Sequence, residues 1–312
     1  QGLVFAVDLG GTHLRIGLVD DTGKIHKQVK LQSPKDESPA ALLDALAGVA
    51  AEWSGGDRCP IIAASVMVPG AVDSEQAVVL SAPNLPSIIN LGLKAVLQER
   101  LGWPVVLEND ANAAAMGEIW LGAARGCRDV VSVTLGTGVG GGVVLGGKLW
   151  RGAHGAAGEI GHTTVDPFSG LKCKCGNTGY LELFPSATAI VRMARESMAQ
   201  FPQAMLSADD LTAEKVYAAG RQGDELAMSV FRPAGKYLGI GLANLMSLID
   251  PEIIVVSGGV VNGWDLLAED MYLEVSERAF RATAQQVKIA PAECGDNAGL
   301  LGAARLAFDE MG

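Results

Sequence analysis

Two stretches of the chain share one pattern of apolar and polar positions. Residues 3–20 run from an apolar segment, through Gly10-Gly11-Thr12, into a second segment in which apolar residues alternate with others. Residues 130–146 follow the same plan around a Gly-Thr-Gly turn. Alternation with a period of two predicts strands, so each stretch predicts a β-hairpin. Two copies of one unit indicate two related domains, and we expect the functional site in a cleft between them.

Strands and helices are predicted to alternate around these hairpins. In the first half we expect a strand over 24–31, a helix over 38–53, a buried strand over 61–68, a helix over 91–102, a buried strand over 104–108 and a helix from 109. In the second half we expect mainly helices over 186–249, a strand over 251–256, a helix over 264–282, a strand over 286–290 and a last helix from 296 to 308. This order predicts an α/β fold, with the last helix packed on the first domain.

The glycines near residue 136 also satisfy the dinucleotide-binding pattern G-x-G-x-x-G, through Gly136, Gly138 and Gly141. In that motif the turn must open a helix. Here the apolar residues 143–145 continue as a strand, which argues against a dinucleotide site. Glycine N–H groups in such a turn can approach a bound phosphate closely, so we expect a phosphate-binding turn instead.

Composition narrows the class of protein. The 312 residues are 49% apolar and 19% charged, which predicts a folded chain of about two domains. No apolar run reaches the roughly 18 residues of a membrane span. The first ten residues show no features of a signal peptide, so we expect a cytoplasmic protein without a membrane partner. A net charge of −11 argues against a broad nucleic-acid surface, but not against a nucleotide held by backbone N–H groups.

Five polar side chains occupy positions that suit a catalytic or ligand-binding role. Asp8 ends the first strand, and Asp110 lies where a strand meets a helix, the usual ligand position in α/β sheets. The alternative for Asp110 is a plain helix N-cap. Asn84, between two prolines, is either a binding amide or a turn residue. Glu159 and His162 are three residues apart, so a helical turn would place them on one side.

Four segments occur in a fixed order: DLGGTHLR at 8–15, ENDANAAAMGE at 108–118, a glycine signature from Leu135 to His162, and VVSGGVV at 255–261. In sequence and order they resemble the ROK family (repressor, open reading frame, kinase), particularly its glucokinase-like members. The resemblance covers nearly the whole chain.

This resemblance implies two RNase H-like domains of the actin and hexokinase type, with a catalytic cleft between them. The implied N-terminal sugar and phosphate domain comprises residues 1–118 and 297–312, and the nucleotide-binding domain comprises 119–296. The implied substrates are ATP, with Mg²⁺, and a sugar. A homodimer is usual in the family.

The resemblance also implies roles for individual residues. Asp110 would be the base that takes the proton from the sugar hydroxyl. The implied sugar contacts are Gly70, Asn84, Asn109, Asp110, Glu159, His162 and Glu182. The implied phosphate contacts are Gly10, Gly11, Thr12, Thr137 and Gly138, with Gly258 and Gly259 at the nucleoside and Asp8 holding Mg²⁺ through water. Phosphoryl transfer needs mainly positioning, charge stabilisation and one carboxylate that accepts a proton, which these residues would supply.

Family members bind zinc through a histidine and the three cysteines of C-x-C-G-x-x-G-C-x-E. This chain has His162, Cys173 and Cys175, but Tyr180 stands at the third cysteine. A neutral phenol is a poor zinc ligand, and structural sites are closed tetrahedra. Two interpretations stay open: zinc completed by water or another group, and a metal-free loop packed through Tyr180, which we favour. Cys59, Cys127 and Cys294 are expected to be buried, and no disulfide framework is expected.

The expected function is phosphorylation of a hexose at its 6-hydroxyl, with glucose as the first candidate. N-acetylmannosamine, N-acetylglucosamine and fructose kinases of the same family remain alternatives, although Glu159 with His162 fits a fructose site less well by resemblance. The family's repressors carry a helix-turn-helix of on the order of 60 residues before the first phosphate motif, which here begins at residue 8. A regulator without catalysis is a further alternative, against which the intact Asp8 and Asp110 argue.

Overall fold

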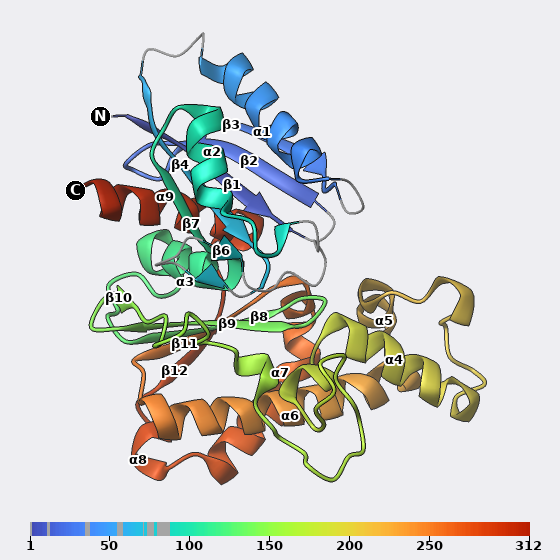
Figure 1. Ribbon diagram of the computed structural model, residues 1–312. Helices are drawn as coiled ribbons and strands as arrows, with labels where there is room; N and C mark the ends of the chain where they lie inside the picture. The colour runs from blue at the N-terminus through green and yellow to red at the C-terminus, as the bar shows by residue number, and fades with distance from the viewer. Residues whose placement is uncertain are drawn as a thin grey trace. The chain divides into compact units, whose positions relative to one another are not determined.

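The computed structural model describes residues 2–10, 13–34, 38–54, 59–70, 72–73, 78–79 and 88–312. Gly11, Thr12 and Asn84, three of the predicted contacts, lie outside the described residues. The chain divides into two compact units (Figure 1). Unit 1 comprises Gln1–Gly126, Gly142–Ala157 and Glu293–Gly312, and unit 2 comprises Cys127–Gly141 and Gly158–Ala292.

These units differ from the expected division, because 119–126, 142–157 and 293–296 belong to unit 1. The buried carboxylate of Glu118 explains two of these segments. It accepts hydrogen bonds from the backbone N–H groups of Ala123, Glu293 and Cys294, which ties both segments to the end of one helix.

Unit 1 is built on a five-stranded sheet in the order β3-β2-β1-β4-β7. Its strands are β1 (Leu3–Leu9), β2 (His13–Val19), β3 (Ile25–Gln32), β4 (Ile61–Val68) and β7 (Val105–Asn109). The first three strands pair antiparallel, as the alternating pattern predicts, whereas β4 and β7 run parallel to β1. A short antiparallel pair, β5 (Val72–Asp73) and β6 (Val78–Val79), lies outside this sheet.

Helices cover both faces of this sheet. They are α1 (Pro39–Ser54), α2 (Leu93–Leu101), α3 (Asp110–Leu121) and α9 (Ala298–Met311). The apolar sides of α1 and α2 join one core cluster with Phe5 and Val7 of β1. The other face is covered by α9, which packs against β1 and α3 (Figure 1). The predicted docking of the last helix on the first domain is therefore confirmed.

The second sheet repeats the topology of the first, in the order β10-β9-β8-β11-β12. Its strands are β8 (Val130–Leu135), β9 (Val139–Leu145), β10 (Lys148–Leu149), β11 (Ile253–Ser257) and β12 (Lys288–Pro291). Again a three-stranded antiparallel meander is extended by two parallel strands. Because the glycine turn after β8 leads into strand β9 and not into a helix, the rejection of a dinucleotide-binding turn is confirmed.

The helices of unit 2 are α4 (Ala187–Ser197), α5 (Ala213–Gly220), α6 (Glu225–Ile249), α7 (Trp264–Arg278) and α8 (Arg281–Ala284). Short 3-10 helices lie at Ile160–His162, Leu181–Leu183, Met198–Gln200, Ala208–Asp210 and Gly259–Gly263, with one more at Gly295–Asn297 in unit 1. The core of unit 2 joins α6 and α7 to alternate residues of β8 and β11, among them Val131 and Val133. In the described part of the chain, every helix is too short or too polar to cross a membrane.

The contact between α3 and α9 depends on glycine. A Cβ on Gly302 of α9 would overlap the backbone carbonyl oxygen of Ala113 in α3. We expect Gly302→Ala to lower the free energy of unfolding by about 3 kcal/mol, because neither helix backbone can yield without losing its packing. Denaturant unfolding followed by circular dichroism measures this change in the free energy of unfolding.

The matched control is Gly48→Ala on the exposed side of α1, where a Cβ meets nothing within 4 Å. This substitution should be neutral or stabilise the protein by up to about 1 kcal/mol. Equal effects of the two substitutions would contradict the prediction.

Candidate active site

The junction of β7 and α3 presents Asp110. Asn109 is the helix cap, since its side-chain oxygen accepts hydrogen bonds from the N–H groups of Ala111 (2.9 Å) and Asn112 (3.0 Å). Asp110 is therefore the first helical residue, and the interpretation of Asp110 as a plain N-cap was wrong. Its half-buried carboxylate accepts the N–H of Ala111 at 2.9 Å. A carboxylate at a helix N-terminus is stabilised in its ionised form, which a proton acceptor requires.

A buried ion pair between Glu108 and Arg151 holds the junction of β7 and α3 in place. Glu108 is 2% exposed, and one of its carboxylate oxygens accepts the Asn109 N–H (2.9 Å) and the Asn112 side-chain amide (3.0 Å). Its other oxygen lies 2.5 Å from Nε of Arg151. Neither Glu108 nor Arg151 was predicted as a site residue. The available signal was an acid at the end of an otherwise apolar strand, which needs a partner when buried.

Asn109 also joins two predicted sugar contacts. Its side-chain amide donates to the backbone carbonyl of Gly70 at 2.8 Å, and Gly70 itself has a positive φ of 111°. The ends of β4 and β7 are neighbours in the sheet, so both residues belong at the same edge. Gly70, Asn109 and Asp110 are therefore close together, as predicted for one binding site.

Asp8 lies at the end of β1 with little exposure of its side chain, 14%. Its Oδ2 atom is 3.4 Å from Arg15, whose guanidinium also pairs with Asp296 at 3.2 Å. Burial raises the pKa of Asp8, and the charge of Arg15 offsets only part of that rise. A cation beside this carboxylate would lower its pKa again, and Mg²⁺ prefers carboxylate oxygen. The residues present therefore fit the expected role of Asp8 in holding Mg²⁺.

The glycine turn between β8 and β9 is held by the start of α4. The N–H of Gly136 donates to the carbonyl of Gly138, the N–H of Ala187 donates to the carbonyl of Gly136 at 2.8 Å, and Thr188 Oγ1 donates to the carbonyl of Thr137 at 2.7 Å. These hydrogen bonds fix the turn, which suits a phosphate-binding loop.

Gly258 follows β11, which pairs with β8 in the second sheet. Its φ is 92°, and a Cβ there would overlap the carbonyl oxygen of Leu135 at the end of β8. Only glycine fits this position. The predicted phosphate contacts Thr137 and Gly138 and the predicted nucleoside contact Gly258 therefore lie at one edge of this sheet, where α/β proteins bind ligands.

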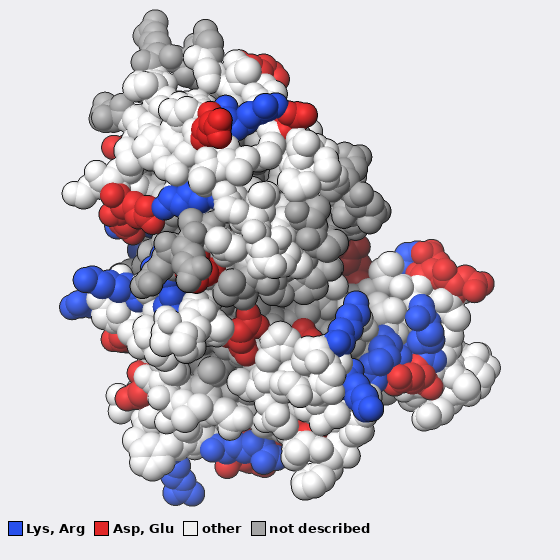
Figure 2. All heavy atoms as spheres, in the orientation of Figure 1, with Lys and Arg blue, Asp and Glu red and all other residues white. Residues whose placement is uncertain are grey.

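A cavity of about 520 Å³ opens beside Thr137. It is also lined by Thr188, Arg192 and Arg195 of α4, and by Thr212 at the start of α5. Figure 2 shows a small group of basic side chains over the region of α4 and α5, whereas basic and acidic groups are interspersed elsewhere on that face. The size is typical of small-molecule sites. Sequence reasoning missed the α4 and α5 residues, because no local motif marks them.

Glu159, His162 and Glu182 form a polar group in unit 2. Glu159 Oε2 lies 2.8 Å from His162 Nδ1 across the short helical turn, as their spacing predicted. Glu182 Oε1 lies 3.9 Å from Nε2 of the same ring. His162 is about two-fifths exposed, so its edge and both carboxylates can meet a hydroxylated ligand. These three predicted sugar contacts are therefore close together.

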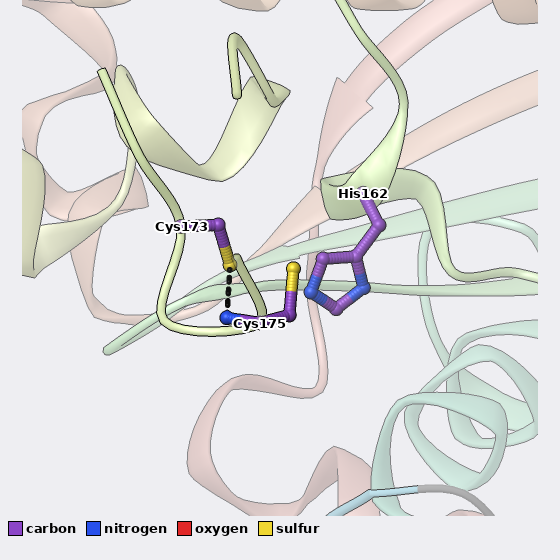
Figure 3. A group of neighbouring side chains, drawn as sticks. All are labelled: His162, Cys173 and Cys175. Atoms are coloured by element: carbon purple, nitrogen blue, oxygen red, sulfur yellow. Dashed lines mark hydrogen bonds between the residues drawn. The ribbon is translucent and has the colours of Figure 1, made fainter. Parts of the chain in front are cut away.

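The thiols of Cys173 and Cys175 lie beside His162 (Figure 3). One ligand atom from each of the three residues lies within 4.8 Å of the others, a spacing that one metal ion could bridge. Burial raises the pKa of the Cys173 thiol to about 11, and that thiol donates to Glu182 Oε1 at 3.1 Å. The ring of Tyr180 packs edge-to-face on His162, with the ring centroids 5.2 Å apart.

All five cysteines are free thiols. Cys127 and Cys294 are half-buried, but Cys59 is exposed, so its expected burial was wrong. Cys59 precedes the buried part of β4, where the chain is still at the surface.

Comparison with known proteins adds four findings. The model of the ROK family matches residues 4–310. A glucokinase of Thermotoga maritima is 34% identical, over 99% of this chain and 98% of its own. An N-acetylmannosamine kinase of Shigella flexneri is likewise 34% identical, over 98% of this chain and 99% of its own. The crystal structure of a ROK family glucokinase from Streptomyces griseus, in complex with glucose and AMPPNP, is 37% identical with a TM-score of 0.84, and the match covers 99% of this chain and 100% of that one.

The Glu108–Arg151 pair yields a test of the junction that carries Asp110. Arg151→Met removes the cation and leaves Glu108 buried with two neutral donors. We expect the free energy of unfolding to fall by about 2–3 kcal/mol, less than for a fully buried pair because Arg151 is one-third exposed. Urea unfolding measures the change. Lys148→Met, which removes an exposed cation nearby in the chain, is the control and should change the free energy by less than about 0.5 kcal/mol. A similar small loss for Arg151→Met would show that the pair does not stabilise the junction.

Proposed function

The chain belongs to the ROK family, and we propose that it is an ATP-dependent glucokinase that forms glucose 6-phosphate. The observation that carries this proposal is the full-length similarity to glucokinases, one of them solved with glucose and an ATP analogue. The chain's own residues are consistent with it, because the described parts of each family segment occupy sheet edges suited to ligands.

Asp110 is the proposed general base. Its carboxylate accepts the proton of the sugar's 6-hydroxyl as that oxygen attacks the γ-phosphorus of ATP. A new P–O bond forms to the sugar, the bond between the γ-phosphorus and the bridging oxygen breaks, and ADP leaves with those electrons. Glu108 and Asn109 hold Asp110 in place through the start of α3. The protein's contribution is then mainly positioning.

The donor is proposed to bind in unit 2. The fixed turn around Thr137 and Gly138 offers backbone N–H groups to phosphate oxygens, and Arg192 and Arg195 add positive charge in the adjoining cavity. The nucleoside lies near Gly258 and Gly259 in this proposal. Mg²⁺, when bound with Asp8, would neutralise charge on the phosphates.

The proposed sugar contacts are Asn109, Asp110, Glu159 and His162. Carboxylate, imidazole and amide groups can form hydrogen bonds with sugar hydroxyls. These bonds matter because a buried hydroxyl without a hydrogen-bond partner costs about 1–3 kcal/mol of binding free energy. N-acetylmannosamine is the second candidate substrate, because an N-acetylmannosamine kinase has the same 34% identity to this chain as the Thermotoga glucokinase.

From the family membership we also propose that the protein is a cytoplasmic homodimer. Light scattering of the purified protein would give twice the 32.3 kDa chain mass for a dimer.

Removal of the proposed base should separate binding from chemistry. We expect Asp110→Asn to retain glucose binding by calorimetry while turnover with ATP and Mg²⁺ falls by ~10²-fold or more, on the usual scale of general-base loss. The control is Asp21→Asn, which changes an exposed turn residue outside all four family segments. It should keep full turnover. Normal turnover of Asp110→Asn would refute its catalytic assignment.

A coupled ADP-release assay over glucose, mannose, fructose, N-acetylglucosamine and N-acetylmannosamine tests the substrate. We expect the highest kcat/KM with glucose. We also expect Glu159→Gln to raise the KM for glucose roughly tenfold, the size of one hydrogen bond to a charged group, with the KM for ATP unchanged. A preference for N-acetylmannosamine would select the second candidate, and no turnover on any sugar by the folded protein would favour a non-catalytic regulator.

A further inference from the structure

Arg151 binds a carboxylate that contacts residues on both sides of the proposed base. Its Nε atom lies 2.5 Å from Oε2 of Glu108, which is 2% exposed. The other oxygen of Glu108 accepts the N–H of Asn109 and the side-chain amide of Asn112. The carboxylate of Glu108 therefore connects Arg151 to the residue before Asp110 and to the first turn of α3.

The guanidinium of Arg151 sets the orientation of this carboxylate. Without Arg151, the Oε2 atom would be buried and would lack this donor, which costs more free energy than a hydrogen bond lost at the surface. Glu108 would then rotate or draw in water, and its Oε1 atom would leave the two donors that it accepts. Asn109 is the N-cap of α3, so a change there moves Asp110, the first helical residue.

The backbone that carries Arg151 is itself held in place. The carbonyl of Arg151 accepts the N–H of Ala157 at 3.0 Å, which closes the loop 151–157. Gly155 in this loop has a φ of 70°, and a Cβ there would overlap the carbonyl oxygen of Val72 in β5. The loop is therefore attached to β5 as well as to β7, and a side chain on a fixed backbone can hold its partner in one position.

Strand β9, which precedes this loop, also approaches the start of α3. A Cβ on Gly142 would lie only 3.0 Å from the carbonyl oxygen of Ala111 and 2.9 Å from the Cβ of Ala115. One continuous segment of unit 1, residues 142–157, therefore packs against the first turns of α3 and also supplies Arg151.

We propose that Arg151 is a positioning residue for phosphoryl transfer. Through Glu108 it holds the carboxylate of Asp110 where that group can accept the proton of the sugar hydroxyl. Arg151 touches none of the reacting atoms and acts only through the junction of β7 and α3. This inference rests on the proposed kinase function. A displacement of about 1 Å can lower turnover by on the order of 10²-fold, so a cation that does not touch the substrate can still control the rate.

Arg151→Met separates turnover from binding. We expect kcat with ATP and the preferred sugar to fall by ~10-fold or more, because a displaced base is felt mainly in the transition state. The Kd of that sugar by calorimetry and the KM for ATP should change by less than about threefold. Each variant is assayed at a temperature at which circular dichroism shows it to be fully folded.

Arg151→Lys is the conservative variant. The charged nitrogen of lysine is one bond further along the side chain than Nε of arginine, so it can reach the same oxygen of Glu108. We expect kcat to return to within about threefold of the wild type, although lysine lacks the planar guanidinium. A kcat as low as that of Arg151→Met would overturn the proposal that this cation holds the base.

Arg278→Met is the matched control. Arg278 also pairs with a buried glutamate, Glu274, at 2.5 Å, but both residues belong to α7 of unit 2. Its removal should lower stability and leave kcat unchanged. An equal loss of kcat in Arg278→Met and Arg151→Met would show that the loss follows from instability, and would overturn the proposal. Wild-type kcat in folded Arg151→Met would overturn it as well.

Glu108→Gln covers the case in which Arg151→Met does not fold. Glutamine has one acceptor oxygen where the carboxylate has two, so it cannot accept from Arg151 and from Asn109 on its two sides. We expect the same pattern, a lower kcat with little change in sugar binding. Normal kcat in folded Glu108→Gln would contradict the proposal.

Hydrogen exchange distinguishes a failure of this inference from a failure of the proposed function, because it needs no turnover. The backbone N–H groups of Asn109, Ala111 and Asn112 donate to the Glu108 and Asn109 side chains. They should exchange ~10-fold faster in Arg151→Met than in the wild type, and at the wild-type rate in Arg278→Met. Inactivity of the wild type on every sugar would refute the kinase function. Unchanged exchange at these three groups in Arg151→Met would overturn the role of Arg151, whatever the activity.

Discussion

The buried carboxylate of Glu108 is the constraint on which the candidate catalytic centre depends. A charge this deep in the protein is stable only when its oxygens are fully paired. Arg151 neutralises it, while the Asn109 N–H and the Asn112 side chain satisfy the other oxygen. These contacts determine where β7 stops and α3 starts. The same contacts fix the position of Asp110, the residue that follows Asn109.

In the second sheet, the candidate phosphate-binding turn is held mainly through its backbone. It accepts hydrogen bonds from Ala187 and Thr188 at the start of α4, and Gly258 closely approaches Leu135. Both sheets have the same strand order, so in each the end of the first strand stands beside the end of its parallel neighbour. Two copies of one topology thus yield two candidate ligand-binding edges, one with carboxylates and one with glycines and arginines.

Glu182 contacts two parts of unit 2. Its Oε1 atom lies 3.1 Å from the thiol of Cys173 and 3.9 Å from Nε2 of His162, and its Oε2 atom lies beside Gly138 in the turn between β8 and β9. Tyr180, which stands where the family has a cysteine, packs its ring edge-to-face on His162.

The sequence by itself determined the elements of secondary structure and the two hairpins, and it supplied the candidate site residues. Local periodicity and turn chemistry depend on neighbours along the chain, so β4 and the start of α3 were predicted closely. Only the tertiary structure decided which distant residues complete the site. Arg151 reaches Glu108, and α4 and α5 line the cavity beside Thr137, yet no local pattern marks these partners. The packing of 142–157 with unit 1 is of the same kind. Such contacts join residues far apart in the chain, and burial and charge, which act in three dimensions, select them.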